Sequence, residues 1–325
     1  VTWFANLPVP IGNQIVAAMN AVLAGACKTV LVYHSVFRDP SRSRSAARDP
    51  YRIRAAEGFY DMRAWHGTGH VAVEPETIFG SAAYAVWASR YVHETGLSRE
   101  QLGLIALNGR ANARGNPNAV MREPLTMDDY LAARMIREPL CLYDMDVPVD
   151  GGDAFVITTT ERARELRSTP VLIHAATLGQ QRHVEEELTQ DLDHTGQAIV
   201  ADVLWGRSDL KLQDVDLYYP YDGFSIITLK WFESIGYCKS GEAGAFLQDN
   251  WDDASGRLLI DGRVPVNTHG GSLSEGGTQG AGHLREAVQQ LRGELDDRQV
   301  PGARTALVTA GGFFYNAQGI LLRSE

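Results

Sequence analysis

The sequence predicts an α/β fold in which helices alternate with the strands of mixed sheets. From residue 170 onward, strand-like and helix-like segments follow one another in the order βαβαβαββ. The chain also holds two similar units, each with one helix-like and two strand-like segments. With 325 residues, 44% of them hydrophobic, it has enough apolar side chains for a large core.

The first elements follow from the spacing of apolar residues. Ile11, Ile15 and Met19 fall on one face of a helix over 11–24, and Gly25 is suited to end it. Further elements expected before residue 165 are a strand over 29–33, a helix near 76–95, a capping box from Ser98 to Gln101, a strand over 102–107, a glycine- and asparagine-rich loop over 108–118 and a strand over 153–160.

The second part of the chain is more regular. Strands are expected over 170–177, 215–219, 264–268, 303–310 and 317–324, and helices near 190–205, 223–235 and 283–293. The last helix and the two strands after it repeat the order helix, strand, strand seen at the start of the chain. This repeat predicts a duplicated fold, with a first half over 1–165 that carries an insertion at about 35–150, and a second half over 166–325.

Composition excludes several classes of function. A formal net charge of −10 disfavours a nucleic-acid partner, and no apolar run approaches the roughly 20 residues that span a bilayer. The first residues lack the basic segment of a signal peptide. The cysteines, Cys27, Cys141 and Cys238, are isolated from one another, which predicts no metal motif and suits the cytoplasm.

Two local stretches carry candidate function. Positions 37–54 hold six arginines against two aspartates, including Arg42 and Arg44. This stretch is either a solvated loop or a site for a polyanion such as a nucleotide phosphate. Positions 266–283 are rich in glycine, contain His269, and have no lysine, arginine or cysteine. Neither a P-loop nor thiol chemistry is therefore expected there. The segment "GGTQGAG" at 276–282 mimics a dinucleotide fingerprint, but no strand directly precedes it and no acidic residue follows at the expected place.

Four sequence segments occur in the order and at the spacing found in one protein family: "VDLYYPYDGFS", "VNTHGGSLSEG", "HLREAVQQLRG" and "ARTALVTAGG". The chain resembles the thiolase superfamily, in its sterol-carrier and lipid-transfer branch. The segment "LCLYDMDVPVDGGDAFVITT" resembles the end of that family's N-terminal half. The resemblance covers essentially the whole chain and implies that it begins inside that half, with the insertion serving as the family's loop domain over the pocket.

The resemblance also shows what is replaced. Where the family places its nucleophilic cysteine, this chain has "NLPVPIGNQ". The family's Gly-His-Pro motif falls on 275–278, without a histidine, and its late cysteine falls in "TAGGFFYN", without a thiol. A covalent acyl-enzyme needs an activated nucleophile, so none is expected. The family's Asn-Glu-Ala-Phe turn corresponds to 221–224, which places Tyr221 at the pocket.

With these catalytic residues replaced, the chain resembles the steroid side-chain-cleaving aldolases of the superfamily. This resemblance implies retro-aldol cleavage of a β-hydroxyacyl-CoA, with Tyr221, His269 and Tyr315 as catalytic candidates. Histidine titrates near pH 6.5 and suits a base, while tyrosine is the readier donor, although the two roles of Tyr221 and His269 stay open. Backbone N–H groups of Gly270, Gly271, Gly311 and Gly312 are expected near the thioester, and Arg42 and Arg44 near the CoA phosphates.

Other interpretations stay open. A homologue without catalytic residues could carry acyl-CoA or lipid, and an active thiolase is disfavoured by the missing thiols. Asp222 is expected to cap the helix at 223, and His283 to face solvent at the start of its helix. The resemblance further implies a homodimer, a small OB-fold partner, an acyl-CoA substrate and no separate cofactor, because CoA is part of the substrate.

Overall fold

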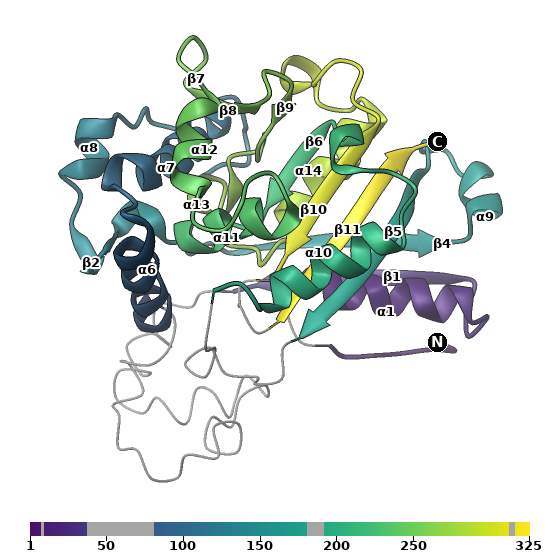
Figure 1. The fold of residues 1–325 in the computed structure, drawn as a ribbon. Helices are drawn as coiled ribbons and strands as arrows, with labels where there is room; N and C mark the ends of the chain where they lie inside the picture. The colour runs from purple at the N-terminus through teal and green to yellow at the C-terminus, as the bar shows by residue number, and fades with distance from the viewer. Residues whose placement is uncertain (8–9, 38–80, 181–191, 312–315) are drawn as a thin grey trace.

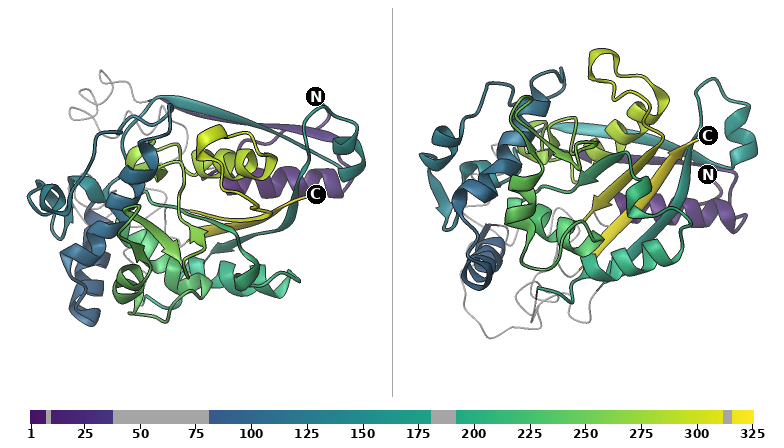
Figure 2. Two further views of the ribbon diagram at one scale, coloured as in Figure 1. Left: turned by 90° about the horizontal axis from the view of Figure 1, so that it is seen from above. Right: turned by 45° about the horizontal axis from the view of Figure 1, so that its top comes forward.

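The computed structural model describes residues 1–7, 10–37, 81–180, 192–311 and 316–325. Sheets and helices alternate in layers (Figure 1). Seen from above, a two-stranded sheet lies outermost, followed by two helices, a four-stranded sheet and two further helices (Figure 2). This layered arrangement confirms the predicted α/β class.

The four-stranded sheet has the order β5-β11-β10-β6. Its strands are β5 (Val171–Gln180), β6 (Leu217–Pro220), β10 (Thr305–Ala310) and β11 (Asn316–Ser324). Strand β10 runs parallel to β6 and antiparallel to β11, so the sheet is mixed as predicted. One face is covered by α10 (Gly196–Gly206) and α11 (Ser225–Ile235), and the other by α1 (Ile11–Leu23) and α14 (Ala281–Arg292).

The two-stranded sheet pairs β1 (Thr29–Val36) antiparallel with β4 (Gly151–Thr158). Helices α1 and α14 lie between this pair and the four-stranded sheet (Figure 2). Each half therefore contributes one central helix and one antiparallel pair, α1 with β1 and β4, and α14 with β10 and β11. The boundary between the halves at residues 165 and 166 stays a prediction.

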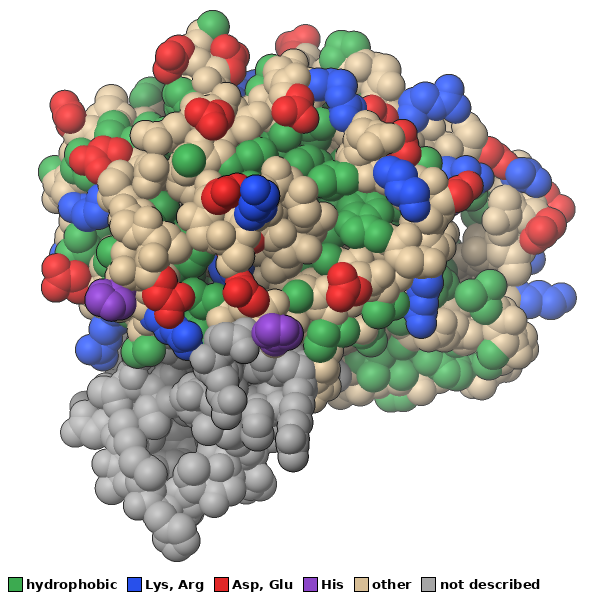
Figure 3. Space-filling view, in the orientation of Figure 1, with side chains coloured by type: hydrophobic (Ala, Val, Ile, Leu, Met, Phe, Trp, Pro, Cys, Tyr) green, Lys and Arg blue, Asp and Glu red, His purple; other side chains and the backbone are tan. Residues whose placement is uncertain are grey.

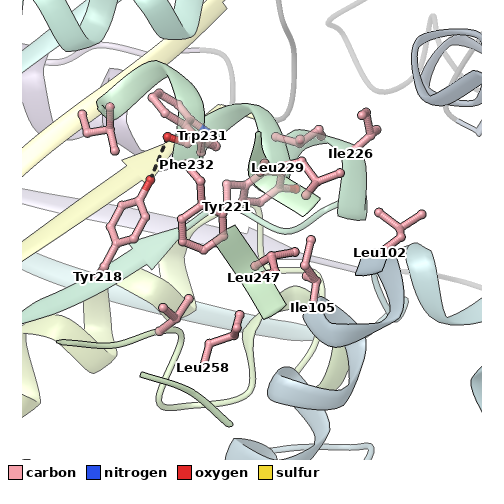
Figure 4. Close-up of a cluster of buried hydrophobic side chains, with 14 of the residues drawn as sticks. Leu102, Ile105, Tyr218, Tyr221, Ile226, Leu229, Trp231, Phe232, Leu247 and Leu258 are labelled. Atoms are coloured by element: carbon pink, nitrogen blue, oxygen red, sulfur yellow. Dashed lines mark hydrogen bonds between the residues drawn. The ribbon is translucent and has the colours of Figure 1, made fainter. Parts of the chain in front are cut away.

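The core has two parts, divided by the four-stranded sheet. On β6, Leu217 and Tyr219 belong to the cluster around α1 and α14, whereas Tyr218 belongs to the cluster around α11. Successive residues of a strand point to opposite faces, which explains this alternation. The α11 cluster reaches Leu102 and Ile105 of the inserted region (Figure 4).

The strand predicted over 102–107 is wrong, because these residues lie inside α7 (Arg99–Ala113). The Ser98–Gln101 capping box, correctly predicted, begins this helix. The apolar run looks strand-like because α7 packs on several neighbours and is buried on more than one side. Short apolar runs do not distinguish the two states. Helix α7 also takes the first six residues of the loop expected over 108–118.

The strand predicted over 264–268 shortens to β9 (Val264–Pro265), which leaves the main sheet. It joins β7 (Trp251–Asp252) and β8 (Arg257–Ile260) in a separate three-stranded sheet that was not predicted. The βαβαβαββ order therefore loses one strand.

The other described elements are α6 (Ser81–Thr95), α8 (Met127–Leu131), β2 (Met135–Arg137), β3 (Leu140–Cys141), α9 (Thr160–Arg164), α12 (Ala243–Asp249) and α13 (Gly271–Ser274). None of the described helices is both long and apolar enough to cross a membrane.

Candidate active site

The candidate site lies where the parallel strands β6 and β10 end. Tyr221 directly follows β6, and its backbone N–H donates to the carbonyl oxygen of Thr309 at 2.9 Å. Beside it, the backbone N–H of Asn267 donates to the Tyr218 carbonyl at 3.0 Å, and Nδ2 of Asn267 donates to the Pro220 carbonyl at 2.9 Å. These bonds hold the segment after β9 alongside β6. The carboxyl ends of parallel strands are the usual place for a site in α/β folds.

A cluster of three buried titratable side chains forms the centre of the site. The rings of His269 and His283 meet edge to face, with centroids 4.6 Å apart. Nε2 of His283 lies 2.9 Å from Oδ1 of Asp222. All three residues are at most 2% exposed. His283 lies in the first turn of α14, and the prediction that it faces solvent is wrong.

Asp222 does not cap α11, whose N-cap is Phe224. Its carboxylate instead accepts hydrogen bonds from the backbone N–H groups of Ser272, at 2.7 Å, and Leu273, at 3.4 Å. Asp222 therefore caps the short helix α13, which follows His269. This correction matters because the carboxylate is shared between that helix and His283.

His269 is a buried imidazole without hydrogen bonds. Neither ring nitrogen has a partner among the described residues, and the nearest carboxylate oxygen, Oε2 of Glu275, is 3.8 Å from Nε2. That distance is too long for a hydrogen bond. Burial, and then the positive charges of His283, Arg285 and Arg298, lower the pKa of His269 well below its ordinary value. The ring is therefore neutral near pH 7, with one donor and one acceptor available to a ligand.

Tyr221 also packs near His283. Its ring centroid is 5.8 Å from that of His283, and its side chain is buried next to the apolar α11 cluster (Figure 4). The ring also covers the Cα of Gly223, because a Cβ there would come within 2.8 Å of the Tyr221 hydroxyl oxygen. The two predicted residues, Tyr221 and His269, therefore meet around a third that was not predicted.

The glycines at the N-terminus of α13 are required by geometry. Gly270 has φ +109° and packs against Ala113, and Gly271 has φ +66° and faces the Asp222 carboxylate. The N–H of Gly270 donates to the Asn267 carbonyl at 2.8 Å and is therefore already paired. Gly311, with φ +109°, follows β10 at the same end of the sheet.

The remaining predicted site residues, Tyr315, Gly312, Arg42 and Arg44, lie outside the described residues. Within the part of the chain that the structure describes, no three histidine, cysteine or acidic side chains are placed to hold a metal ion.

Three asparagines of the inserted region hold the His269 segment and were not predicted. Nδ2 atoms of Asn108 and Asn112 both donate to the Val266 carbonyl, at 3.0 and 2.9 Å. Nδ2 of Asn116 donates to the His269 carbonyl at 2.8 Å and to Oε1 of Glu275 at 2.9 Å. The spacing of four residues between them was a usable signal, because it places Asn108 and Asn112 on one helical face.

Glu275 connects the site to the outer sheet. Nη2 of Arg285 lies 2.5 Å from Oε1 of Glu275, and Nη1 lies 2.7 Å from Oδ1 of Asp153 on β4. Burial raises the pKa of Glu275 above its usual value, although Arg285 acts in the opposite direction. Arg285 thus fixes the carboxylate that faces His269.

The comparisons with known proteins identify the family of this chain. The family described as Thiolase C-terminal domain-like matches residues 180–324. A 17-hydroxy-3-oxo-4-pregnene-20-carboxyl-CoA lyase of Mycobacterium tuberculosis is 36% identical over 71% of this chain and 59% of its own length. The solved Ltp2-ChsH2(DUF35) aldolase is 30% identical, with a TM-score of 0.77 over 96% of this chain and 77% of that one. The chain belongs to the thiolase superfamily.

A second relative shows similar identity and coverage. A steroid side-chain-cleaving aldolase of Thermomonospora curvata is 35% identical over 74% of this chain and 61% of its own length. The chain spans about six tenths of the length of these two curated relatives. The resemblance stated from the sequence is therefore confirmed at the level of the superfamily.

The cysteines of this superfamily member lie elsewhere. Cys27 packs with the α1 cluster, Cys141 lies in β3 beside Asp144, and Cys238 lies near Glu233. Burial raises the pKa of Cys141 to about 11 and that of Cys238 to about 12, so both remain thiols at neutral pH. A thiolate is the reactive form, and the environments of these two cysteines disfavour it.

A large cavity, of about 1030 Å³, lies away from this chemistry. It is enclosed by α1, β4, α9, β5 and α14, and a hollow opens beside the α9 segment (Figure 3). Its walls include Ile15, Ile173 and Val288, and also Arg285, which contacts Glu275 of the site, but neither histidine of the site nor Tyr221. Chemical function is better located by the buried polar cluster than by cavity size.

Proposed function

We propose that this protein cleaves a β-hydroxyacyl-CoA thioester with a steroid-like side chain by a retro-aldol reaction, giving a ketone and a shorter acyl-CoA. The observation that carries the proposal is the buried, unpaired imidazole of His269 at the end of β6. The names of the lyase and aldolase relatives support the same reaction class. The cytoplasm is the proposed location, because isolated free thiols suit a reducing compartment.

Retro-aldol cleavage needs a base for the hydroxyl proton and a donor for the oxygen of the thioester enolate, and no covalent adduct. Neutral His269 has a free lone pair that suits the base. The phenol of Tyr221 is proposed as the donor, with Tyr315 as a further candidate and the N–H groups of Gly271, Gly311 and Gly312 near the thioester. Arg42 and Arg44 are proposed to contact the CoA phosphates.

The experiment is incubation with a β-hydroxyacyl-CoA whose hydroxyl is on a ring carbon, followed by mass spectrometry. We expect a ketone and a shorter acyl-CoA from the wild-type protein. His269→Ala and Tyr221→Phe should each slow cleavage by roughly 10²-fold or more, since acid–base help and oxyanion donors are worth that much. Near-full activity of both variants would refute this mechanism.

Partners are part of the same proposal. The name of the solved aldolase joins Ltp2 to ChsH2(DUF35), and the resemblance implies a small OB-fold partner and a homodimer. The cleavage assay is therefore run with and without such a partner protein, and the mass of the complex is measured by light scattering. No separate cofactor is added, because CoA enters as part of the substrate.

Acyl-CoA or lipid carriage without turnover is a second candidate, favoured by the apolar walls of the 1030 Å³ cavity. A carrier would bind a fluorescent acyl-CoA and release it unchanged. Val288→Trp, which narrows the cavity, should weaken binding in a carrier and leave cleavage unaffected in an aldolase. The two candidates thus give opposite results in one pair of assays.

A further inference from the structure

Asp222, His283 and His269 form a cluster whose two imidazoles differ in surroundings. The three come from separate segments: the turn after β6, the first turn of α14 and the loop before α13. Each is at most 2% exposed, and the imidazole rings are 4.6 Å apart. Two histidines so close cannot both carry a positive charge without strong repulsion.

His283 is the ring with a counter-charge. Asp222 accepts from two backbone N–H groups at the start of α13, which stabilise it as an anion. Its Oδ1 lies 2.9 Å from Nε2 of His283, so a proton on Nε2 points at a carboxylate. This arrangement, a carboxylate orienting an imidazole, leaves Nδ1 as the nitrogen for exchange with a substrate.

His269 is the imidazole ring without a hydrogen-bonded counter-charge. Its nitrogens have no hydrogen-bond partner among the described residues, and Glu275 at 3.8 Å is already bound by Arg285 and Asn116. Arg298, a further positive charge near this ring, pairs with Glu286 at 2.9 Å. Burial and the neighbouring positive charges lower the pKa of His269. A neutral imidazole beside one that a carboxylate orients places a base and an acid next to each other.

We propose that His283, held by Asp222, is the acid that protonates the α-carbon after cleavage, and that His269 is the base that starts it. The proposal rests on the retro-aldol function given above and adds a catalytic residue to it. Asp222 is its positioning residue, because it acts through His283.

The steps balance without any further reactant. His269 takes the hydroxyl proton while the bond between the α- and β-carbons breaks and the β-carbon becomes a ketone. The bond electrons pass into the thioester enolate, whose negative charge, together with that of the Asp222 carboxylate, offsets the two protonated rings at this stage. The proton of His283 then goes to the α-carbon, and a proton passing from His269 to His283 restores the starting state.

The test runs the cleavage in D₂O with a substrate that carries an α-methyl group. A deuteron delivered by a fixed acid makes the α-carbon of the product a CHD centre of one configuration. A free enolate deuterated by solvent gives both configurations equally. The configuration of the product therefore reports whether a fixed acid delivers the deuteron. If His283 had only a structural role, its replacement would not change this configuration.

Four variants are compared after thermal unfolding confirms that each is folded. In His283→Gln we expect cleavage about 10²-fold slower, with both configurations in the product. In His269→Gln we expect a similar loss with one configuration retained. Asp222→Asn should lower kcat about 10²-fold with little change in KM. His174→Gln is the matched control, because His174 pairs with Asp209 at 2.8 Å outside the site, and it should change neither rate nor configuration.

A single configuration from His283→Gln, or both configurations from the wild-type protein, overturns the assignment of His283. An unchanged kcat in Asp222→Asn overturns the role of Asp222. Long incubation at high enzyme concentration supplies product from the slow variants. Failure of the proposed function is distinct, because the wild-type protein would then release no ketone at all.

Discussion

Nε2 of His283 lies 2.9 Å from Oδ1 of Asp222, although the two residues are 61 positions apart. The contact joins the turn after β6 to the first turn of α14, and therefore the sheet to the central helix layer. Because Asp222 also caps α13, one carboxylate fixes both the helix after His269 and the ring beside it. The site is consequently built on the packing of layers rather than on a flexible loop.

Gly271→Ala should destabilise the protein and abolish cleavage. Gly271 has φ +66°, and a Cβ there would overlap the Asp222 carboxylate. Gly293 is the matched control, because it has φ +73° with nothing within 4 Å of its Cβ position. We expect Gly293→Ala to cost about 1–2 kcal/mol from backbone strain, and Gly271→Ala about 2 kcal/mol more from the overlap. Urea unfolding measures both, and equal losses would contradict the role of Asp222 as the fixed neighbour.

Asn116→Ala should loosen the His269 segment. Its Nδ2 bonds the His269 carbonyl and Glu275, and the side chain is completely buried. Removing it leaves the buried carbonyl oxygen of His269 without this donor, at a cost of about 1–3 kcal/mol, while Oε1 of Glu275 keeps its contact with Arg285. Asn118→Ala, two residues away and exposed, serves as the control. The midpoint temperature of thermal unfolding and the cleavage rate should both fall for Asn116→Ala and stay unchanged for Asn118→Ala. Equal values for the two variants would exclude a role of Asn116 in holding the His269 segment.

Acidification should weaken folding partly through His269. Its pKa in the folded protein is well below the ordinary value of 6.5, so below that pH the unfolded chain binds a proton that the folded protein does not. Stability therefore falls as the pH falls, by up to about 1.4 kcal/mol per pH unit for one group. His34, whose pKa is also lowered by burial, adds an effect of the same sign.

The measurement is urea unfolding between pH 7.5 and 5.5. His269→Gln should lose less stability over this range than the wild-type protein, while His93→Gln, exposed on α6, should match the wild type. Asp144, whose pKa burial raises, is present in all three proteins and cancels in the comparison. Glu275 lies 3.8 Å from His269, and its pKa, which burial raises, gives a pH dependence of the opposite sign. Parallel pH profiles for His269→Gln and the wild type would show that His269 is not held neutral.

Alkylation of thiols should leave cleavage intact. Cys141 is buried, and the raised pKa values of Cys141 and Cys238 keep both as unreactive thiols. Cys27 is half-buried and lies beyond the C-terminus of α1. We expect iodoacetamide to modify Cys27 without loss of activity, with Cys27→Ser as the unmodified control. Inactivation that substrate prevents would indicate a thiolase-type nucleophile instead.

The sequence by itself determined the fold class, most element positions, the superfamily and the loss of the thiol machinery. These depend on local patterns and on residue types at aligned positions, which need no coordinates. Local patterns misled where burial came from several sides at once. The apolar run at 102–107 looks strand-like because α7 is buried against several neighbours. Val264 and Pro265 pair with β8, so that only Val266 and Asn267 of the predicted strand contact β6.

Only the tertiary structure decided how the site is assembled. Tyr221 and His269 were predicted from their own motifs, but His283 was expected in solvent and Asp222 as a local cap. Their partners lie 50 and 61 residues away in the chain, and no periodicity encodes such contacts. Protonation of an imidazole depends on the charges and burial that surround it in space. The identities of the site residues therefore came from the sequence, and their electrostatic differences from the packing of sheets against the central helices.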